Sequence, residues 1–284
     1  MLNNKLFQNK PYNHFKGFIS AQADRFSLLC SILDDCFLPC QILEIGEKRH
    51  ILLGDLSDNG RILFTAHYDR APKSPGANDN GAAVFQLIEA ALSFASQQNN
   101  NGTLFIFTDG EELSKDQSIR QQGSYSLGLF LQKKGYGNIP IFSFDACGTG
   151  DTLIISTASD ELLKNENREG AETARRKAQA LRRTALEAAR RARLEKVLLL
   201  PTPFSEDAGF LLSGMTAQTI TVLPASEAAV VQANKAAFYK SSDRRLIPET
   251  WRSLNGPSDS PLRLTPEHWK NIPVFAGALA AGKF

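Results

Sequence analysis

Short runs of apolar residues recur along the chain, and each ends abruptly in polar or charged residues. The clearest runs are residues 62–66, 103–107 and 139–144, and residues 151–157 and 218–223 have the same character. A short apolar run bounded by turn residues is typical of a strand that is buried on both faces. We therefore predict a buried strand in each of these five segments.

Helical periodicity fills much of the space between these runs. Residues 15–36, 82–96 and 123–131 carry apolar side chains three and four positions apart, and a last helix is expected after Thr265, with Thr265 as its cap and Pro266 in its first position. Residues 41–45 and 49–53 flank a Gly-containing turn and predict a β-hairpin. Tight turns are expected at residues 58–60 and 97–102.

Alternation of strands and helices favours an α/β fold with three layers, in which a mostly parallel mixed sheet is covered by helices on both faces. No internal repeat and no linker interrupt the pattern. With 284 residues and 42% apolar content the chain can bury a sizeable core. We expect a single domain over residues 1–284.

Residues 171–197 stand apart because Ala, Arg and Glu dominate them. Alanine and leucine recur at helical spacing, which predicts one long amphipathic helix with a basic outer face. A solvated helix face packed on the sheet is the plainer interpretation. A docking surface for an acidic partner is the alternative.

Composition excludes several classes of protein. A net charge of +2 gives no reason to expect a nucleic-acid partner. No segment approaches the roughly 18 apolar residues of a membrane span, and the first residues lack the apolar core of a signal peptide. The four cysteines do not form paired metal-binding motifs, so we interpret them as buried free thiols. We predict a soluble, cytoplasmic protein that binds neither nucleic acid nor membrane.

The chemistry-bearing residues lie where the predicted strands end. They are His67 and Asp69 after the first strand, Glu111 and Glu112 after the second, Asp145 after the third, and Asp79 before the intervening helix. Parallel neighbouring strands would bring these ends together at the edge where α/β sheets bind ligands. Carboxylates at that density either stay partly protonated or hold a cation, which makes a divalent metal the simplest explanation.

Mixed imidazole and carboxylate ligands favour zinc, with manganese or iron as alternatives and magnesium less suited. Asp79 could bridge two metal ions, and Asp69 could accept the second ring N–H of His67. One of the adjacent residues Glu111 and Glu112 could bind metal while the other handles a proton. Each residue alone has a plainer explanation, such as Asp79 capping its helix. Their joint occurrence at three strand ends favours the metal site.

These residues and their order resemble the co-catalytic zinc aminopeptidases, a metallopeptidase family that also includes the glutaminyl cyclases. The matching segments are AHYD at 66–69, PGANDNGA at 75–82, TDGEE at 108–112, GS at 123–124, FDACG at 144–148, PFSEDAGF at 203–210 and NGPSDSP at 255–261. They extend from about residue 60 to the C-terminus. The resemblance implies the phosphorylase/hydrolase-like α/β fold of these enzymes.

The resemblance also implies a role for each candidate residue. His67, Asp79 and Asp145 would hold one zinc ion, and Asp79 would bridge to a second ion that Glu112 also binds. Glu111 would be the general base for a metal-activated water, and Asp69 would orient His67. The implied substrate is a peptide or a small amide.

One position departs from the family pattern. The family's second zinc normally has a histidine in the C-terminal turn, where this chain has Asn255, and an amide oxygen is a poorer zinc ligand than imidazole. His268 is a doubtful substitute. The resemblance therefore implies one or two zinc ions, with the second ion weak, replaced or absent.

Three functions follow from these residues. The first is a zinc-dependent hydrolase of the aminopeptidase type, which the presence of Glu111 favours. The second is a non-catalytic relative with a degraded second site, which Asn255 and the basic helix favour. The third is a glutaminyl-cyclase-like acyltransferase, which Asn255 disfavours because the single zinc of those enzymes uses that position. Sequence signatures of serine hydrolases, zincins and P-loop enzymes are missing.

Overall fold

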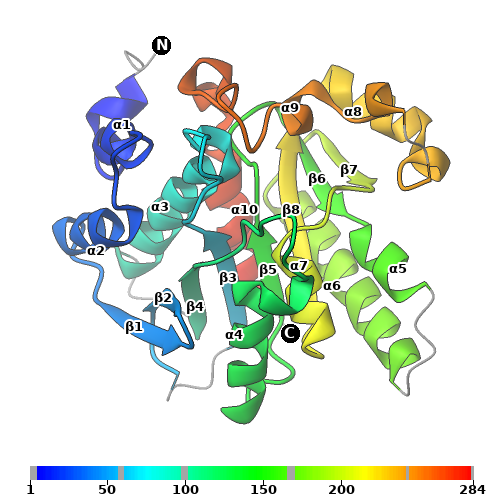
Figure 1. Cartoon of the computed structure of the whole chain (residues 1–284), viewed down its shortest axis with the longest axis horizontal. Coiled ribbons are helices and arrows are strands. Elements are labelled where there is room, and N and C mark those ends of the chain that lie inside the picture. Colours follow the sequence, from blue (N-terminus) through cyan, green and yellow to red (C-terminus); the bar gives the residue numbers. More distant parts are fainter. Residues whose placement is uncertain (1–4, 57–60, 97–101, 165–169, 241–242, 283–284) are drawn as a thin grey trace.

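One mixed β-sheet organises the computed structural model, which describes residues 5–56, 61–96, 102–164, 170–240 and 243–282 (Figure 1). Its strands are β1 (Cys40–Ile45), β2 (Lys48–Leu53), β3 (Ile62–His67), β4 (Thr103–Thr108), β5 (Ile141–Phe144), β6 (Thr152–Ser156), β7 (Val197–Leu200) and β8 (Ala217–Leu223). They lie in the order β1-β2-β4-β3-β5-β8-β6-β7. The predicted hairpin is confirmed as the antiparallel pair β1–β2.

The centre of the sheet is parallel. Strand β3 lies between β4 and β5 and runs parallel to both, and β5 also pairs in parallel with β8. Antiparallel pairing occurs between β1 and β2, between β2 and β4, and between β6 and β8. The three strands whose ends carry the candidate ligands are therefore direct neighbours, as the sequence predicted.

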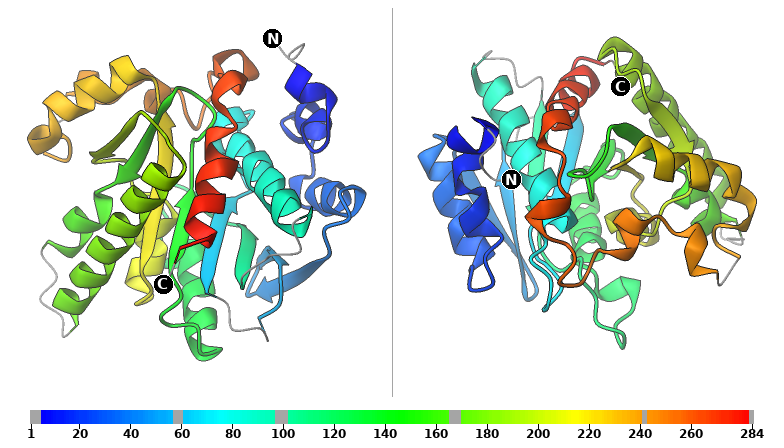
Figure 2. Two further views of the ribbon diagram at one scale, coloured as in Figure 1. Left: turned by 180° about the vertical axis from the view of Figure 1, so that it is seen from behind. Right: turned by 90° about the horizontal axis from the view of Figure 1, so that it is seen from above.

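The described residues form ten α-helices. They are α1 (Phe15–Phe18), α2 (Arg25–Asp35), α3 (Ala83–Ser96), α4 (Gly123–Lys133), α5 (Ala158–Leu163), α6 (Ala171–Arg191), α7 (Glu206–Leu212), α8 (Ala225–Ala233), α9 (Glu249–Arg252) and α10 (Asn271–Ala280). Figure 2 shows α10 against one face of the sheet, between α3 and α6, and these helices contact each other there. Helices α4 and α7 pack together on the opposite face. The predicted three-layer α/β/α fold is confirmed.

Alternating side chains of the central strands pack into two separate hydrophobic cores, one on each face of the sheet. Phe64 and Phe105 join the core beneath α3, α6 and α10. Leu63 and Leu104 point the other way, into the core with Leu127 and Phe210. Both faces of these strands are apolar because helices cover both, which explains why the runs contain so few polar residues.

Two predicted helices have different limits in the structure. Residues 15–36 form two helices rather than one, because the chain turns after α1 and Asp24 caps α2 by accepting a hydrogen bond from the Ser27 N–H, at 3.2 Å. The predicted helix 171–197 ends at Arg191, and Arg193 has a positive φ of 55° that turns the chain. Val197 then begins β7, which pairs with β6. An apolar face of α6 that includes Ala178, Ala185 and Ala188 is buried.

Thr265 does not cap the last helix. Its hydroxyl instead accepts a hydrogen bond from the Gly150 N–H, at 2.8 Å, and fixes the loop after β5. Pro266 begins a 3₁₀ turn, and α10 starts only at Asn271. The turn predicted at 58–60 and most of that at 97–102 lie outside the described residues.

Two further expectations concern the whole molecule. The four cysteines are unpaired, but only Cys36 and Cys147 are buried, whereas Cys30 and Cys40 are half-buried. Among the helices in the described ranges, none has the length and apolar character needed to cross a membrane.

The aromatic centre of the sheet generates the first prediction. Phe64 is fully buried, and its ring centroid lies 5.4 Å from that of Phe105 and 5.7 Å from that of Phe144. Phe64→Ala should lower the free energy of unfolding by about 3–5 kcal/mol, because it leaves a cavity next to β3. Urea unfolding followed by circular dichroism measures this. Phe37→Ala is the matched control: Phe37 is 89% exposed, and its loss should cost about 0.5 kcal/mol or less.

Candidate metal centre

His67 lies at the end of β3 and is completely buried among carboxylates. Its Nε2 atom is 3.1 Å from Asp79 Oδ1 and 3.7 Å from Asp145 Oδ1, and its Nδ1 atom is 3.4 Å from Asp69 Oδ1. One ring nitrogen thus faces two carboxylates and the other faces a third. This is the spatial grouping that the strand ends predicted.

The segment that carries Asp79 is held from the far end of the chain. Both carboxylate oxygens of Asp259 accept backbone hydrogen bonds, from Asn78 N–H at 2.8 Å and from Asp79 N–H at 3.0 Å. Asp259 is itself buried. Asp79 is therefore fixed by its backbone, and its side chain is left to face His67.

The flanking asparagines connect this segment to the loop after β5. The Asn80 amide donates to Phe144 O at 2.8 Å and accepts from Ala146 N–H at 3.2 Å. Asn78 Oδ1 accepts from Gly148 N–H at 2.7 Å. Because these bonds enclose Asp145, they fix the spacing between the carboxylates of Asp79 and Asp145.

Asp69 has two functions in this geometry. Besides facing His67, its carboxylate accepts backbone hydrogen bonds from Glu111 N–H at 3.3 Å and from Glu112 N–H at 3.0 Å. It therefore connects the end of β3 to the end of β4. A carboxylate next to the second nitrogen of a histidine also fixes the orientation of the ring.

Gln122 holds Glu111 in place. Its amide nitrogen donates to Glu111 Oε1 at 3.0 Å, and its oxygen accepts from the Ser124 hydroxyl at 2.9 Å. Gln122 is 5% exposed, and it directly precedes α4. The Glu111 side chain is thus held on one oxygen from outside the cluster of carboxylates.

Arg25, at the start of α2, binds the loop after β3. Its guanidinium donates to four backbone carbonyls, those of Tyr68, Asp69, Pro75 and Gly76, at 2.7–3.3 Å. Burial and the neighbouring charge of Arg70 lower the pKa of Arg25 to about 10, so it remains charged at neutral pH. Arg70 itself donates to Ala21 O.

The carboxylates of the cluster disfavour each other's ionisation. Burial, together with the charges of Asp145 and Asp79, raises the pKa of Glu111 well above its usual range. Burial and the charge of Asp79 raise the pKa of Glu112 to about 8. Burial and Asp145 likewise raise the pKa of Asp79. A cation bound among these groups would remove this penalty.

The donor set fits a zinc ion. His67 Nε2 and the carboxylates of Asp79 and Asp145 offer atoms that all lie within 4.8 Å of one another. The two ring nitrogens of His67 and Asp145 Oδ1 are buried and make no hydrogen bond to another described residue. An imidazole nitrogen that converges with two carboxylates is a ligand set that suits zinc.

Glu112 and Asn255 lie on the outer side of Asp79. The amide of Asn255 is within 2.7 and 2.8 Å of the two Glu112 carboxylate oxygens and 3.2 Å from Asp79 Oδ2. Only acceptors face it there, so without a cation between them its nitrogen, not its oxygen, is the atom that suits this position. Glu112 is thus close to Asp79 but does not belong to the group of three candidate ligands, His67, Asp79 and Asp145.

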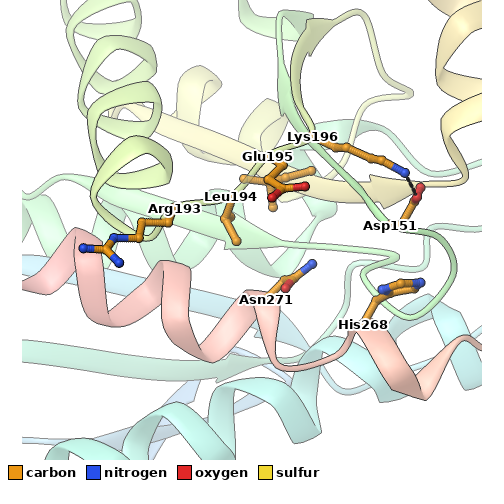
Figure 3. Close-up of a pocket in the computed structure, with 8 residues that line it drawn as sticks. Asp151, Arg193, Leu194, Glu195, Lys196, His268 and Asn271 are labelled. Carbon is orange, nitrogen blue, oxygen red and sulfur yellow. Dashed lines mark hydrogen bonds and ion pairs between the residues drawn. The ribbon is translucent and has the colours of Figure 1, made fainter.

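His268 lies elsewhere. It lines an open pocket of about 340 Å³ together with Asp151, Lys196 and Asn271. Figure 3 shows this pocket and the ion pair that Lys196 makes with Asp151. No candidate metal ligand lines this pocket. His268 is therefore not a substitute ligand for the second ion.

Sequence analysis did not find Arg25, Gln122 or Asp259 as residues of the site. Their side chains hold the backbone or the side chains of candidate residues over long separations in the chain, 181 residues for Asp259 and Asn78. Gln122 and Asp259 had a local signal, because Gln122 precedes the Gly123-Ser124 segment and Asp259 lies within the segment 255–261, but neither signal showed what these side chains bind.

Several solved structures have the same fold as this chain. The chain aligns with a leucine aminopeptidase precursor from Bacteroides thetaiotaomicron (TM-score 0.69, 15% identity, 96% of each chain). It also aligns with a glutaminyl cyclase from the same organism (TM-score 0.69, 16% identity, 96% of this chain and 97% of that one) and with a Zn-dependent exopeptidase from Parabacteroides distasonis (TM-score 0.64, 15% identity, 96% and 97%). The protein has the zinc aminopeptidase fold.

Its family follows from the sequence comparison. The pattern of peptidase family M28 matches residues 51–195, and the chain belongs to this family. A vacuolar membrane protease from Verticillium alfalfae is 30% identical over 111 residues, 36% of this chain and 9% of that protein. Aminopeptidase YwaD from Bacillus subtilis is 42% identical over 52 residues, 18% of this chain and 11% of that protein. The chain thus matches only about a tenth of the length of these curated relatives.

Arg25 generates the prediction for the site. Arg25→Met should lower the free energy of unfolding by about 3 kcal/mol or more, because four carbonyls lose their donor. Arg25→Lys should recover only part of this loss, because an ammonium lacks the planar fork of donors. Urea unfolding measures both variants.

The matched control for this experiment is Arg176→Met on α6. Arg176 is 76% exposed and pairs only with Glu172, so its replacement should change the free energy of unfolding by about 0.5 kcal/mol or less. Equal losses from the Arg25 and Arg176 variants would refute the anchoring role of Arg25.

Proposed function

We propose that this protein is a zinc-dependent hydrolase of the aminopeptidase type, which cleaves a peptide or small amide bond with a metal-activated water. The observation that carries this proposal is the convergence of His67, Asp79 and Asp145 in a buried cluster where His67 Nε2 and Asp145 Oδ1 lack hydrogen-bond partners among the described residues. Family membership and the shared fold support it.

In this proposal His67, Asp79 and Asp145 hold the zinc ion. Asp69 orients His67 through Nδ1 and keeps the end of β4 close by. A zinc ion held by these residues would supply Lewis-acid chemistry, which lowers the pKa of a bound water molecule and polarises a carbonyl group. The buried, helix-covered strands beneath fix the ligands and limit their rearrangement.

Glu111 is the proposed general base. Gln122 binds its Oε1 atom, and the backbone N–H of Glu111 is bound to Asp69, so the side chain is held at the edge of the ligand cluster. Its Oε2 atom is left to accept a proton from the attacking water and to pass it to the leaving amine.

A small pocket of about 30 Å³ lies beside Asp145. Phe204, Trp251 and Leu254 line it together with hydroxyl-bearing residues such as Thr202 and Ser205. A space of that volume holds a group of about the size of water, so it indicates no side-chain preference. The partner we propose is a peptide or a small amide.

Replacing the base tests the proposal. Glu111→Gln should lower kcat toward an alanine or leucine anilide by about 10²–10⁴-fold, because an amide cannot take up the proton. Bound zinc should stay unchanged, because Glu111 is not among the three ligands. Initial rates and metal analysis of the same samples measure both quantities.

Glu187→Gln on the exposed face of α6 is the control and should leave kcat unchanged. A protein that binds zinc but cleaves no aminopeptide or amide, with or without the substitution, would refute the hydrolase and support the non-catalytic binding protein.

A further inference from the structure

The two oxygens of Asp79 face different surroundings. Oδ1 faces His67 Nε2 at 3.1 Å, in the cluster where His67 Nε2 and Asp145 Oδ1 lack hydrogen-bond partners among the described residues. Oδ2 faces the Asn255 amide at 3.2 Å, and the same amide reaches both oxygens of Glu112. One oxygen of Asp79 therefore faces the proposed zinc position, whereas the other faces an amide of the protein.

An amide nitrogen can replace a cation between two carboxylates. Its two N–H groups can be shared between the Glu112 carboxylate and Asp79 Oδ2, and hydrogen bonds to ionised acceptors are the strong ones. The opposite orientation would place the amide oxygen 2.7–3.2 Å from three other oxygens, which is repulsive unless a cation lies between them.

The turn that carries Asn255 is held close to Asp79. Asn255 has a positive φ of 60°, a conformation that asparagine adopts more readily than most residues. Four residues later, Asp259 binds the backbone N–H of Asp79 and donates its own N–H to Gly256 O at 3.0 Å. The turn therefore contacts Asp79 twice. The Asn255 amide faces the side chain of Asp79, and the Asp259 carboxylate binds the backbone N–H of Asp79.

We propose that the Asn255 amide takes the position of a second metal ion, so that the protein binds a single zinc ion at His67, Asp79 and Asp145. This inference rests on the proposed function, because it presupposes that first zinc ion. Asn255 is then a positioning residue: it holds Glu112 against Asp79 and keeps Asp79 Oδ2 from binding metal. Asn255 is an exposed residue, although its amide lies against Glu112 and Asp79.

Metal stoichiometry tests this inference without any measurement of activity. The purified protein is dialysed against excess zinc, and bound metal per chain is measured by elemental analysis. The unchanged chain should bind one zinc ion. Asn255→His and Asn255→Asp should each bind two, because each removes the amide donor and adds a ligand beside Asp79 and Glu112.

Ser258→His is the matched control, because it adds a histidine at an exposed position of the same turn without touching the amide. It should bind one zinc ion. The aspartate variant keeps the size of asparagine, so it tests the inference even if the histidine variant fails to fold.

The remaining outcomes decide against the inference. Two zinc ions in the unchanged chain, or one in a folded Asn255→Asp variant, would overturn it while leaving the hydrolase proposal in place. One zinc ion plus one Mg²⁺ or Mn²⁺ in a parallel dialysis would also overturn it, because the amide oxygen would then be a ligand. No zinc in the unchanged chain or in any variant would instead refute the proposed function itself.

Discussion

Repulsion between carboxylates is the constraint on which this structure depends. Asp69, Asp79, Glu111, Glu112 and Asp145 gather around one buried imidazole, and ionised groups at that density are costly to bury. The chain offsets this cost separately for most of them. Asp69 accepts two backbone N–H groups, Glu111 accepts from Gln122, and Glu112 lies against the Asn255 amide. The charge that remains is concentrated at His67, Asp79 and Asp145, the residues at which we propose a zinc ion.

The strand ends could be predicted from the sequence because each apolar run and the polar residues that end it are adjacent in the chain. An apolar run that ends in His67 or in Asp145 identifies a strand and its functional end together. The parallel neighbours β4, β3 and β5 then bring those ends to one edge of the sheet. Errors occurred where local periodicity continued past a break in the backbone, as at Arg193, whose positive φ ends α6 before β7 begins.

Residues that hold the site could not be predicted in the same way. An arginine within an amphipathic helix, such as Arg25, has no pattern that distinguishes it from a solvated one, and its partners lie 43–51 residues away. Asp259 resembles any acidic turn residue. Its role depends on packing that brings the C-terminal turn onto Asp79, and packing of distant segments is not encoded in a window of neighbouring residues.

The part of the chain that matches family M28 ends well before the turn that carries Asn255 and Asp259, and it begins after Arg25. That matched part contains every candidate ligand from His67 to Asp145, and also Gln122, but it lacks Arg25 and Asp259. Two of the residues that bind the backbone around His67 and Asp79 therefore come from other stretches of the sequence. A fragment of residues 51–195 would keep the candidate ligands but lose these two supports, and substitutions outside the matched part could shift the ligands without changing any of them.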